Sequence, residues 1–428
     1  MTTTEASTFL QPRRSGLALG TAVLLATVLM TSISGGASAA PAGEFTTFRL
    51  GEGGYGGNAI ASGPDGNMWF TNNANNSIGR ITPSGKVAYF EVPTDASLTN
   101  SVGLFSIAAG PDGNMWFTGF YSNVVGTVTP AGRVTTYPVP IDGMLPLGIT
   151  AGSDGNLWFT LDSANGIGRI TPEGEIRLFS TDGAPIEAQG PSSCTMCAYE
   201  ITAGPQGSLW FTLPAAGLVG RMTTQGAVTT FRVPTATDPS PDNAVPVLGG
   251  ITAGADGNLW VVQPADSKVT RMTPKGAVTD IDLPSATANP VSIAPGPGAS
   301  LWVAENGAGA LSRIDISGAK VPATVTQFAM PTANSLPESV ALGTDGSVWF
   351  ANVVRPVDEG AGLKLQVGRV GTGFGALVKV KVTGSAKAGS TLTCSYATKQ
   401  AAVVAGAGFQ WLRGGKPIRD ANARTFTV

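Results

Sequence analysis

The stretch Ile-Ala-Ser-Gly-Pro-Asp-Gly-Asn-Met-Trp-Phe-Thr at residues 60–71 decides the fold, because six close copies of it follow along the chain. The copies occupy residues 107–118, 149–160, 201–212, 251–262, 293–304 and 340–351. Their tryptophans are spaced 42 to 52 residues apart, close to the length of about 40–50 residues that a four-stranded propeller blade requires. The repeat therefore predicts an all-β chain with seven blades.

Turn chemistry divides each repeat into four strands. The first strand ends before a turn such as Pro64-Asp65-Gly66-Asn67, and the second strand carries Trp-Phe-Thr; Asp, Gly and Asn are typical turn residues. A third strand such as 78–82 follows a polar loop. The fourth, such as 134–139, contains a proline, which suits an outer edge strand because proline cannot donate to a ladder.

The seventh repeat lacks a fourth strand of its own, since the pattern ends after Val370. Residues 45–50, Phe-Thr-Thr-Phe-Arg-Leu, nearly copy the fourth strand at 228–233, Val-Thr-Thr-Phe-Arg-Val. Pairing this N-terminal strand into the last blade would remove the exposed edges of an open ring. We predict a seven-bladed β-propeller closed in this way over residues 40–375.

The two ends of the chain have a different character. Residues 1–39 read as a signal peptide, with Arg13 and Arg14 before an apolar run and Ala37-Ser38-Ala39 as the cleavage pattern. We therefore expect export by the twin-arginine or the general secretory route, with no membrane span after cleavage. With 26 Lys and Arg against 28 Asp and Glu, no basic patch indicates nucleic acid.

The recurring side chains of the repeat have structural interpretations. One tryptophan per repeat predicts packing between blades, since it supplies a large buried apolar area. The recurring third-strand arginine, first seen at Arg80, is interpreted as a repeated blade contact. The Asp-Gly-Asn turns are explained by turn chemistry without calcium.

The phrase Ile-Thr-Ala-Gly-Pro-Asp-Gly-Asn-Leu-Trp-Phe-Thr followed by Ile-Gly-Arg-Ile-Thr-Pro resembles the repeat of the streptogramin B (virginiamycin B) lyases over about residues 45–370. The resemblance implies an enzyme that opens a cyclic depsipeptide by β-elimination. It also implies a His as general acid/base and Mg²⁺ held by acidic side chains. In that pattern the His lies two residues before the first-strand Ile, and a Glu directly follows Trp-Phe-Thr.

This chain contains no histidine at all. The first slot, where the resemblance places His, reads Asn58, Phe105, Leu147, Tyr199, Gly249, Val291 and Glu338. The second slot, where it places Glu, reads Asn72, Gly119, Leu161, Leu213, Gln263, Glu305 and Asn352. Since successive strands are antiparallel, both slots are expected at one face of the ring. The base and most of the implied metal cage are therefore missing.

Acidic residues are the remaining candidates for chemistry at this face. Glu305 and Glu338, in neighbouring blades, are candidate catalytic residues of a hydrolase, and Glu305 is a candidate ligand for Mg²⁺ or Ca²⁺. The alternative is that both are solvated carboxylates at loop ends, and no cofactor is required. The predicted binding face consists of Tyr199, Glu200, Leu147, Gln263, Asn352 and Asn72.

The cysteines and the tail complete the prediction. Cys194 and Cys197 are expected to form a local disulfide in an exported protein. Residues 376–428 resemble part of the immunoglobulin-like repeats of actinobacterial surface proteins, with Cys394 and the strand beginning Gln410-Trp411 as core residues. They span about half of such a sandwich.

Three functions remain open at this stage. The first is a non-catalytic extracellular module that binds an unknown ligand or cell-surface component, indicated by the missing histidine and the adhesive-type tail. The second is an enzyme, either a lyase with a changed site or a hydrolase. The third is a structural spacer in the cell envelope, because a propeller accepts many functions.

Overall fold

The computed structural model describes residues 41–52, 59–93, 102–163, 165–181, 196–236, 247–317, 324–356 and 362–373, and five short strands between 380 and 427. These late strands belong to a compact unit separate from the preceding part of the chain. The predicted boundary after residue 375 falls between the described residues.

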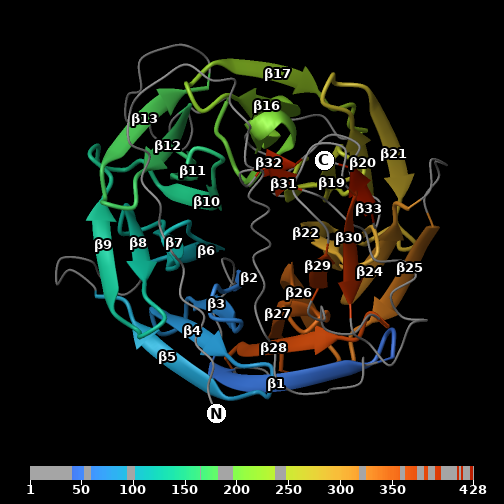
Figure 1. Cartoon of the computed structure of the whole chain (residues 1–428). Coiled ribbons are helices and arrows are strands. Elements are labelled where there is room, and N and C mark those ends of the chain that lie inside the picture. Colours follow the sequence, from blue (N-terminus) through green and yellow to red (C-terminus); the bar gives the residue numbers. More distant parts are fainter. Residues whose placement is uncertain are drawn as a thin grey trace. The chain divides into compact units, whose positions relative to one another are not determined.

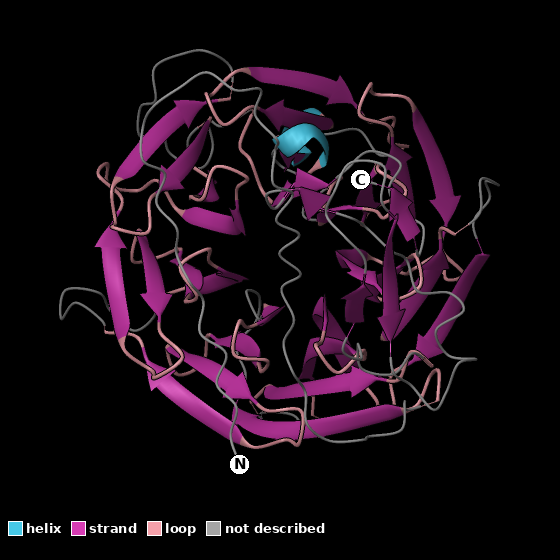
Figure 2. Cartoon of the chain, viewed as in Figure 1, coloured by secondary structure: helices cyan, strands magenta, loops and turns pink. Residues whose placement is uncertain are grey.

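Seven four-stranded antiparallel sheets form a ring of blades, as predicted (Figure 1, Figure 2). The first three blades are β2 (Ile60–Ser62), β3 (Met68–Asn72), β4 (Ser77–Ile81) and β5 (Val87–Glu91); β6 (Leu104–Ala109), β7 (Met115–Gly119), β8 (Val124–Val128) and β9 (Val134–Pro138); and β10 (Pro146–Ala151), β11 (Leu157–Leu161), β12 (Gly166–Ile170) and β13 (Ile176–Ser180). In each blade the first strand is innermost and the fourth is outermost (Figure 1).

The remaining blades continue the same order. They are β14 (Ile201–Ala203), β15 (Leu209–Leu213), β16 (Leu218–Met222) and β17 (Val228–Arg232); β18 (Ile251–Ala253), β19 (Leu259–Gln263), β20 (Lys268–Met272) and β21 (Val278–Asp282); β22 (Pro290–Gly296), β23 (Ser300–Glu305), β24 (Ala310–Asp315) and β25 (Thr324–Ala329); and β26 (Ser335–Leu342), β27 (Val348–Val354) and β28 (Lys364–Val370) with β1 (Phe45–Glu52). Two 3₁₀ turns, η1 (Pro205–Gly207) and η2 (Pro214–Ala216), flank β15.

The N-terminal strand closes the ring, as the sequence predicted. Strand β1 pairs antiparallel with β28, with Phe45 opposite Val370 and Phe48 opposite Val367. The Phe48 ring stacks on Trp349 with ring centroids 5.9 Å apart. The last blade is therefore completed by residues more than 300 positions away in the chain, which protects the edge of β28.

Every repeated tryptophan is buried at a junction between blades. Trp69 of the first blade, for example, clusters with Met115 and Phe117 of the second, and Trp349 of the last clusters with Met68 and Phe70 of the first. Exposure of the seven indoles does not exceed 1%. The tryptophans thus provide the packing between blades that the sequence predicted.

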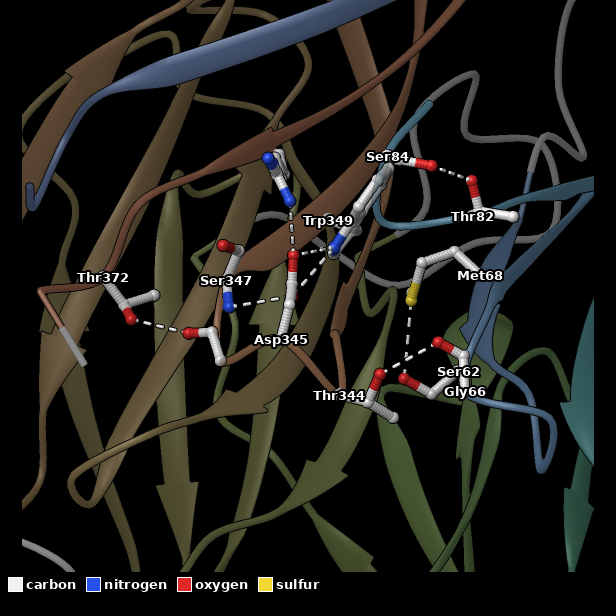
Figure 3. Close-up of polar contacts among 12 residues, drawn as sticks. Ser62, Gly66, Met68, Thr82, Ser84, Thr344, Asp345, Ser347, Trp349 and Thr372 are labelled. Carbon is white, nitrogen blue, oxygen red and sulfur yellow. Dashed lines mark hydrogen bonds and ion pairs between the residues drawn. The ribbon is translucent and has the colours of Figure 1, made fainter. Parts of the chain in front are cut away.

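An aspartate in the first turn anchors most of these tryptophans, and Figure 3 shows the arrangement for Asp345 and Trp349. In five blades the carboxylate accepts the indole N–H at 3.0 to 3.1 Å; the aspartates are Asp65, Asp112, Asp154, Asp256 and Asp345. Where Gln206 and Gly298 replace the aspartate, the indole nitrogens of Trp210 and Trp302 have no partner. The repeated turn thus satisfies a buried donor, in addition to reversing the chain.

The recurring arginine packs over the same tryptophan. The Arg369 guanidinium lies 5.5 Å from the Trp349 ring and its Nη1 bonds Asp345 Oδ2 at 2.7 Å. Arg80, Arg169 and Arg221 lie over their own tryptophans at 5.4 to 5.9 Å. This confirms that the arginine is a repeated structural contact, combining a cation–π and a charge interaction.

The late strands form a small unit of their own. Strands β29 (Val380–Thr383), β30 (Thr391–Tyr396) and β33 (Thr425–Thr427) pair in one sheet, and β31 (Leu412–Arg413) pairs with β32 (Lys416–Pro417). The immunoglobulin-like assignment stays a prediction. No helix in the described part of the chain is long and apolar enough to cross a membrane, and the predicted signal peptide lies outside the described residues.

Replacing Asp256 by Ala tests the anchoring turn. The Asp256 side chain is 15% exposed, and its removal leaves the indole of Trp260 and the guanidinium of Arg271 without their acceptor. We expect a loss of about 1–3 kcal/mol in the free energy of unfolding at pH 7, measured by urea denaturation. The control Asp282→Ala, at a carboxylate with 86% exposure, is expected to change it by less than about 0.5 kcal/mol.

The difference between wild type and Asp256→Ala should also depend on pH. Burial alone would raise the pKa of Asp256, but hydrogen bonds from Asn258, Arg271 and Trp260 outweigh it and lower the pKa below its usual range. The stabilisation is therefore present above about pH 4 and is lost as the pH falls through the folded-state pKa. A difference that stays constant down to pH 2 would contradict this assignment.

Candidate functional site

The first strands of several blades carry a β-bulge at the first slot. In β22 the register shift falls at Val291, and in β26 it falls at Glu338. Shifts in β6 and β10 enclose Phe105 and Leu147. Because a bulge redirects a side chain out of the regular ladder, this position can present residues toward the centre of the ring.

The threonine of Trp-Phe-Thr fixes this bulge across two blades. Thr160 Oγ1 accepts the N–H of Gly148 in its own blade at 2.9 Å and donates to the carbonyl of Tyr199 in the next blade at 2.6 Å. Thr118 donates in the same way to the carbonyl of Leu147. The backbone of the first slot is therefore held by hydrogen bonds that do not depend on the slot side chain.

A central cavity of about 310 Å³ opens against these inner strands. Its volume is at the lower end of the range for small-molecule sites, about 300–1,000 Å³. The described lining comes from six of the seven blades and consists of Ala59, Ile60, Phe105, Ser106, Ile107, Tyr199, Glu200, Gly250, Ile251, Val291, Ser292, Ile293, Asn306, Glu338 and Ser339. Four first-slot residues, Phe105, Tyr199, Val291 and Glu338, thus share one cavity.

Glu200 is the carboxyl group most perturbed by this environment. Burial raises its pKa to about 7, against the smaller opposing effect of the hydrogen bond from the Ile201 N–H. Its Oε2 atom lies against the backbone of Gly148, 3.2 Å from where a β-carbon at that glycine would be. Glu200 can therefore exchange a proton near neutral pH, as a general acid or base must.

Three carboxylates affect the pKa of the Tyr199 hydroxyl. Burial, followed by the negative charges of Glu200, Asp162 and Glu338, raises the pKa of the Tyr199 hydroxyl well above its usual value. Burial also raises the pKa of Asp162. The Tyr199 ring meets Phe105 edge to face, with centroids 5.9 Å apart and planes at 79°. One side of the cavity therefore combines negative charge with aromatic surface.

Glu305 lies elsewhere, inside the sixth blade. Its side chain is fully buried, Gln327 Nε2 donates to Oε2, and Oε1 has no partner. Burial raises its pKa against the opposing hydrogen bond from Gln327. Glu305 is not among the described residues that line the cavity, so the structure does not bring Glu305 and Glu338 into one site.

The residues of the predicted binding face other than Tyr199 and Glu200 are also buried. Gln263 donates to Thr270, whose hydroxyl donates to Asp280. Asn352 donates to Ser335 and Gln366 at 3.1 and 3.0 Å. The exposure of Asn72 is 2% and that of Leu147 is 3%. Of the predicted binding face, Tyr199 and Glu200 are the residues that line the cavity.

The implied Mg²⁺ does not fit the residues that are present. Gly119, Leu161 and Leu213 offer no ligand atom at the second slot, and the Glu305 carboxylate is buried against Gln327. The described residues contain no group of three His, Cys, Asp or Glu side chains that could hold a metal ion.

Two features near Tyr199 complete the site. Cys197 is disulfide-bonded, and Ala198 between it and Tyr199 is fully buried. The predicted partner Cys194 lies outside the described residues, so that pairing stays a prediction.

Asp162 was not predicted from the sequence. The signal that could have indicated it is an acidic residue immediately after Leu161 of the second slot.

Sequence and structure comparisons point to one family. The model of the virginiamycin B lyase family matches residues 27–198 and 180–358. A streptogramin B lyase structure is 29% identical, with a TM-score of 0.63, over 76% of this chain and 97% of that chain. Virginiamycin B lyase from Staphylococcus aureus is 27% identical, with a TM-score of 0.61, over 77% of this chain and 99% of that chain.

A third similar structure is a catalytically inactive histidine-to-alanine variant of virginiamycin B lyase from Staphylococcus aureus with quinupristin. It is 28% identical, with a TM-score of 0.62, over 76% of this chain and 100% of that chain. A search of curated proteins found no match.

Replacing Glu305 by Gln tests whether the ionised carboxylate lowers the free energy of unfolding. Because the folded-state pKa of Glu305 is raised, the protein loses stability as the pH rises above the unfolded-state value of about 4.3. A neutral, isosteric Gln removes this loss. We expect the variant to gain on the order of 1 kcal/mol in unfolding free energy at pH 7.5 and to match wild type at pH 4.

Urea denaturation at both pH values provides the measurement, with Glu91→Gln, at an exposed position of β5, as the control. A variant that is less stable than wild type at pH 7.5 would show that the hydrogen bond from Gln327 outweighs the cost of burying the charge, contrary to the raised pKa of Glu305.

Proposed function

The chain belongs to the virginiamycin B lyase family, and from this premise we propose that it is a ligand-binding propeller that holds a small molecule in its central cavity without performing an elimination reaction. The proposal rests on the residues that occupy the first slot. Phe105, Tyr199, Val291 and Glu338 line the cavity from that slot, and the chain has no histidine to act from it.

The requirements of the reaction support a binding role. Elimination across an ester needs a base for the proton and stabilisation of the departing carboxylate. The cavity contains no imidazole, and the residues at the second slot do not fit a metal ion. A similar protein from Staphylococcus aureus with its histidine replaced by alanine is described as inactive, yet its structure is with quinupristin. Loss of the histidine is thus compatible with retained binding.

One observation favours an enzyme as the second candidate. Glu200 has a pKa of about 7 and lines the cavity together with Glu338. A carboxylate of that pKa is suited to activate a water molecule at neutral pH. The second candidate is therefore a hydrolase with Glu200 as general base, in place of the Glu305 and Glu338 pair that sequence alone suggested.

We place this binding function outside the cell, at the cell surface or in the medium. The signal-peptide pattern of residues 1–39 and the tail that resembles bacterial surface domains support this location. N-terminal analysis of protein secreted by a host cell would test it, with cleavage after Ala39 or Ala40 expected.

Incubation with quinupristin and Mg²⁺ tests binding against catalysis. We expect calorimetry to detect binding and chromatography to recover the intact ring after prolonged incubation. Elimination changes no mass, so a linear isomer must be sought by retention time and proton NMR; hydrolysis adds the mass of one water. Recovery of the isomer would overturn the proposal, and a hydrated product lost in Glu200→Gln would establish the second candidate.

A matched pair of variants locates the bound molecule. Ser106 lines the cavity, so Ser106→Trp should fill it and weaken binding at least about tenfold. Ser84 lies on an exposed turn, and Ser84→Trp is expected to bind as wild type does. Equal binding by both variants would place the ligand outside the cavity.

A further inference from the structure

We propose that the central cavity selects an organic cation: an ammonium group with apolar substituents, held against Glu200 and Glu338 and faced by the rings of Phe105 and Tyr199. This inference rests on the proposed binding function and specifies the chemical class of its ligand.

The charged residues in the described lining of the cavity are all acidic. Glu200 and Glu338 are its charged lining residues, and no Lys or Arg occurs in the described lining. The arginines of the repeat are engaged at the other end of the blades, where Arg271 and Arg369 pair with aspartates of the first turn at 2.8 and 2.7 Å. A cationic ligand would complement the negative charge of this lining.

Aromatic surface lies beside these carboxylates. The Phe105 and Tyr199 rings meet edge to face, and Tyr199 is close enough to Glu200 and Glu338 for both charges to raise its pKa. The face of an aromatic ring attracts cations, and aromatic residues combined with carboxylates are suited to organic ammonium groups. The same residues offer no recognition for an anionic ligand.

The remaining wall suits the apolar part of such a ligand. The first-strand isoleucine of the repeat reaches the cavity in four blades, as Ile60, Ile107, Ile251 and Ile293. A bare metal ion would require several oxygen ligands at close range, and the described residues contain no group of three His, Cys, Asp or Glu side chains to provide them. The combination of a volume near 310 Å³, apolar walls and two carboxylates therefore favours an organic cation over an inorganic one.

Two isosteric probes separate charge from shape. Acetylcholine carries a quaternary ammonium group, and 3,3-dimethylbutyl acetate replaces its nitrogen by carbon at nearly the same size. We expect calorimetric or ligand-observed NMR titration of the purified protein to show at least about tenfold tighter binding of the cation. Equal affinities, or no binding of the cation, would overturn the inference.

Isosteric variants assign the selectivity to the two carboxylates. Glu200→Gln and Glu338→Gln should each weaken acetylcholine binding about tenfold and leave binding of the neutral ester unchanged. Glu91→Gln, on the exposed face of β5, should alter neither. Thermal unfolding of each variant verifies the fold. Unaltered acetylcholine binding in both cavity variants would contradict the assignment.

The pH dependence gives an independent readout. Because the pKa of Glu200 is about 7, acetylcholine should bind more weakly at pH 5.5 than at pH 8, and Glu200→Gln should reduce this difference. Glu338, Asp162 and Tyr199 also surround the site, and the raised pKa of Asp162 adds a smaller change in the same direction. An affinity for the cation that is equal at both pH values would contradict the role of Glu200.

Competition and the depsipeptide experiment distinguish the remaining outcomes. Displacement of acetylcholine by millimolar Mg²⁺ or Ca²⁺ would make the cavity an inorganic cation site and overturn the inference. Binding of quinupristin without selectivity between the two probes would leave the proposed function intact while refuting the ligand class. Failure of the cavity to bind quinupristin and both probes would refute both.

Discussion

The burial of one tryptophan at each junction between blades is the contact on which the ring depends. In all seven junctions the indole packs against the following blade, including the junction from the last blade back to the first. A blade alone is a small sheet with two apolar faces, so it gains stability only from its neighbours. Because the junctions hold the inner strands side by side, residues from six blades can line one cavity.

The cavity wall is held in two different ways around the ring. In the second and third blades Thr118 and Thr160 link each first slot to the next blade. In the last three blades Val262, Ala304 and Ala351 take the place of that threonine. In the sixth and seventh blades a serine after the slot forms the bridge instead: Ser292 Oγ accepts from the Val340 N–H and Ser339 Oγ from the Ile60 N–H.

The same three blades also carry polar residues at the second slot. Gln263, Glu305 and Asn352 each have an oxygen atom without a partner. Buried acceptors of this kind are commonly satisfied by internal water. In these three blades the loss of the threonine thus coincides with buried polar groups at the second slot.

The repeat made the fold predictable, because the blade length, the turn residues and the copied strand at 45–50 are all local patterns. The first slot was predictable for the same reason. The second slot was not, since side chains alternate along a strand: Trp302 and Ala304 face the next blade, whereas Leu301 and Val303 pack with the preceding one. Glu305 alternates in step with Leu301 and Val303, so its side chain lies on their side of the strand. Antiparallel pairing fixes the edge at which a residue lies, but not the face on which its side chain is placed.

The properties of Glu200 depend on distant parts of the chain, which explains why no motif indicates them. Its carboxylate is desolvated beside Gly148 of the preceding blade, and a larger residue there would displace it. Only the folded ring brings these positions together.

The anchoring of the first slot by backbone hydrogen bonds has a further consequence: the slot side chain can change without loss of the cavity. The chemistry that the slot can offer and the shape of the cavity are therefore set by different groups, the first by the slot side chain and the second by the threonine and serine bridges.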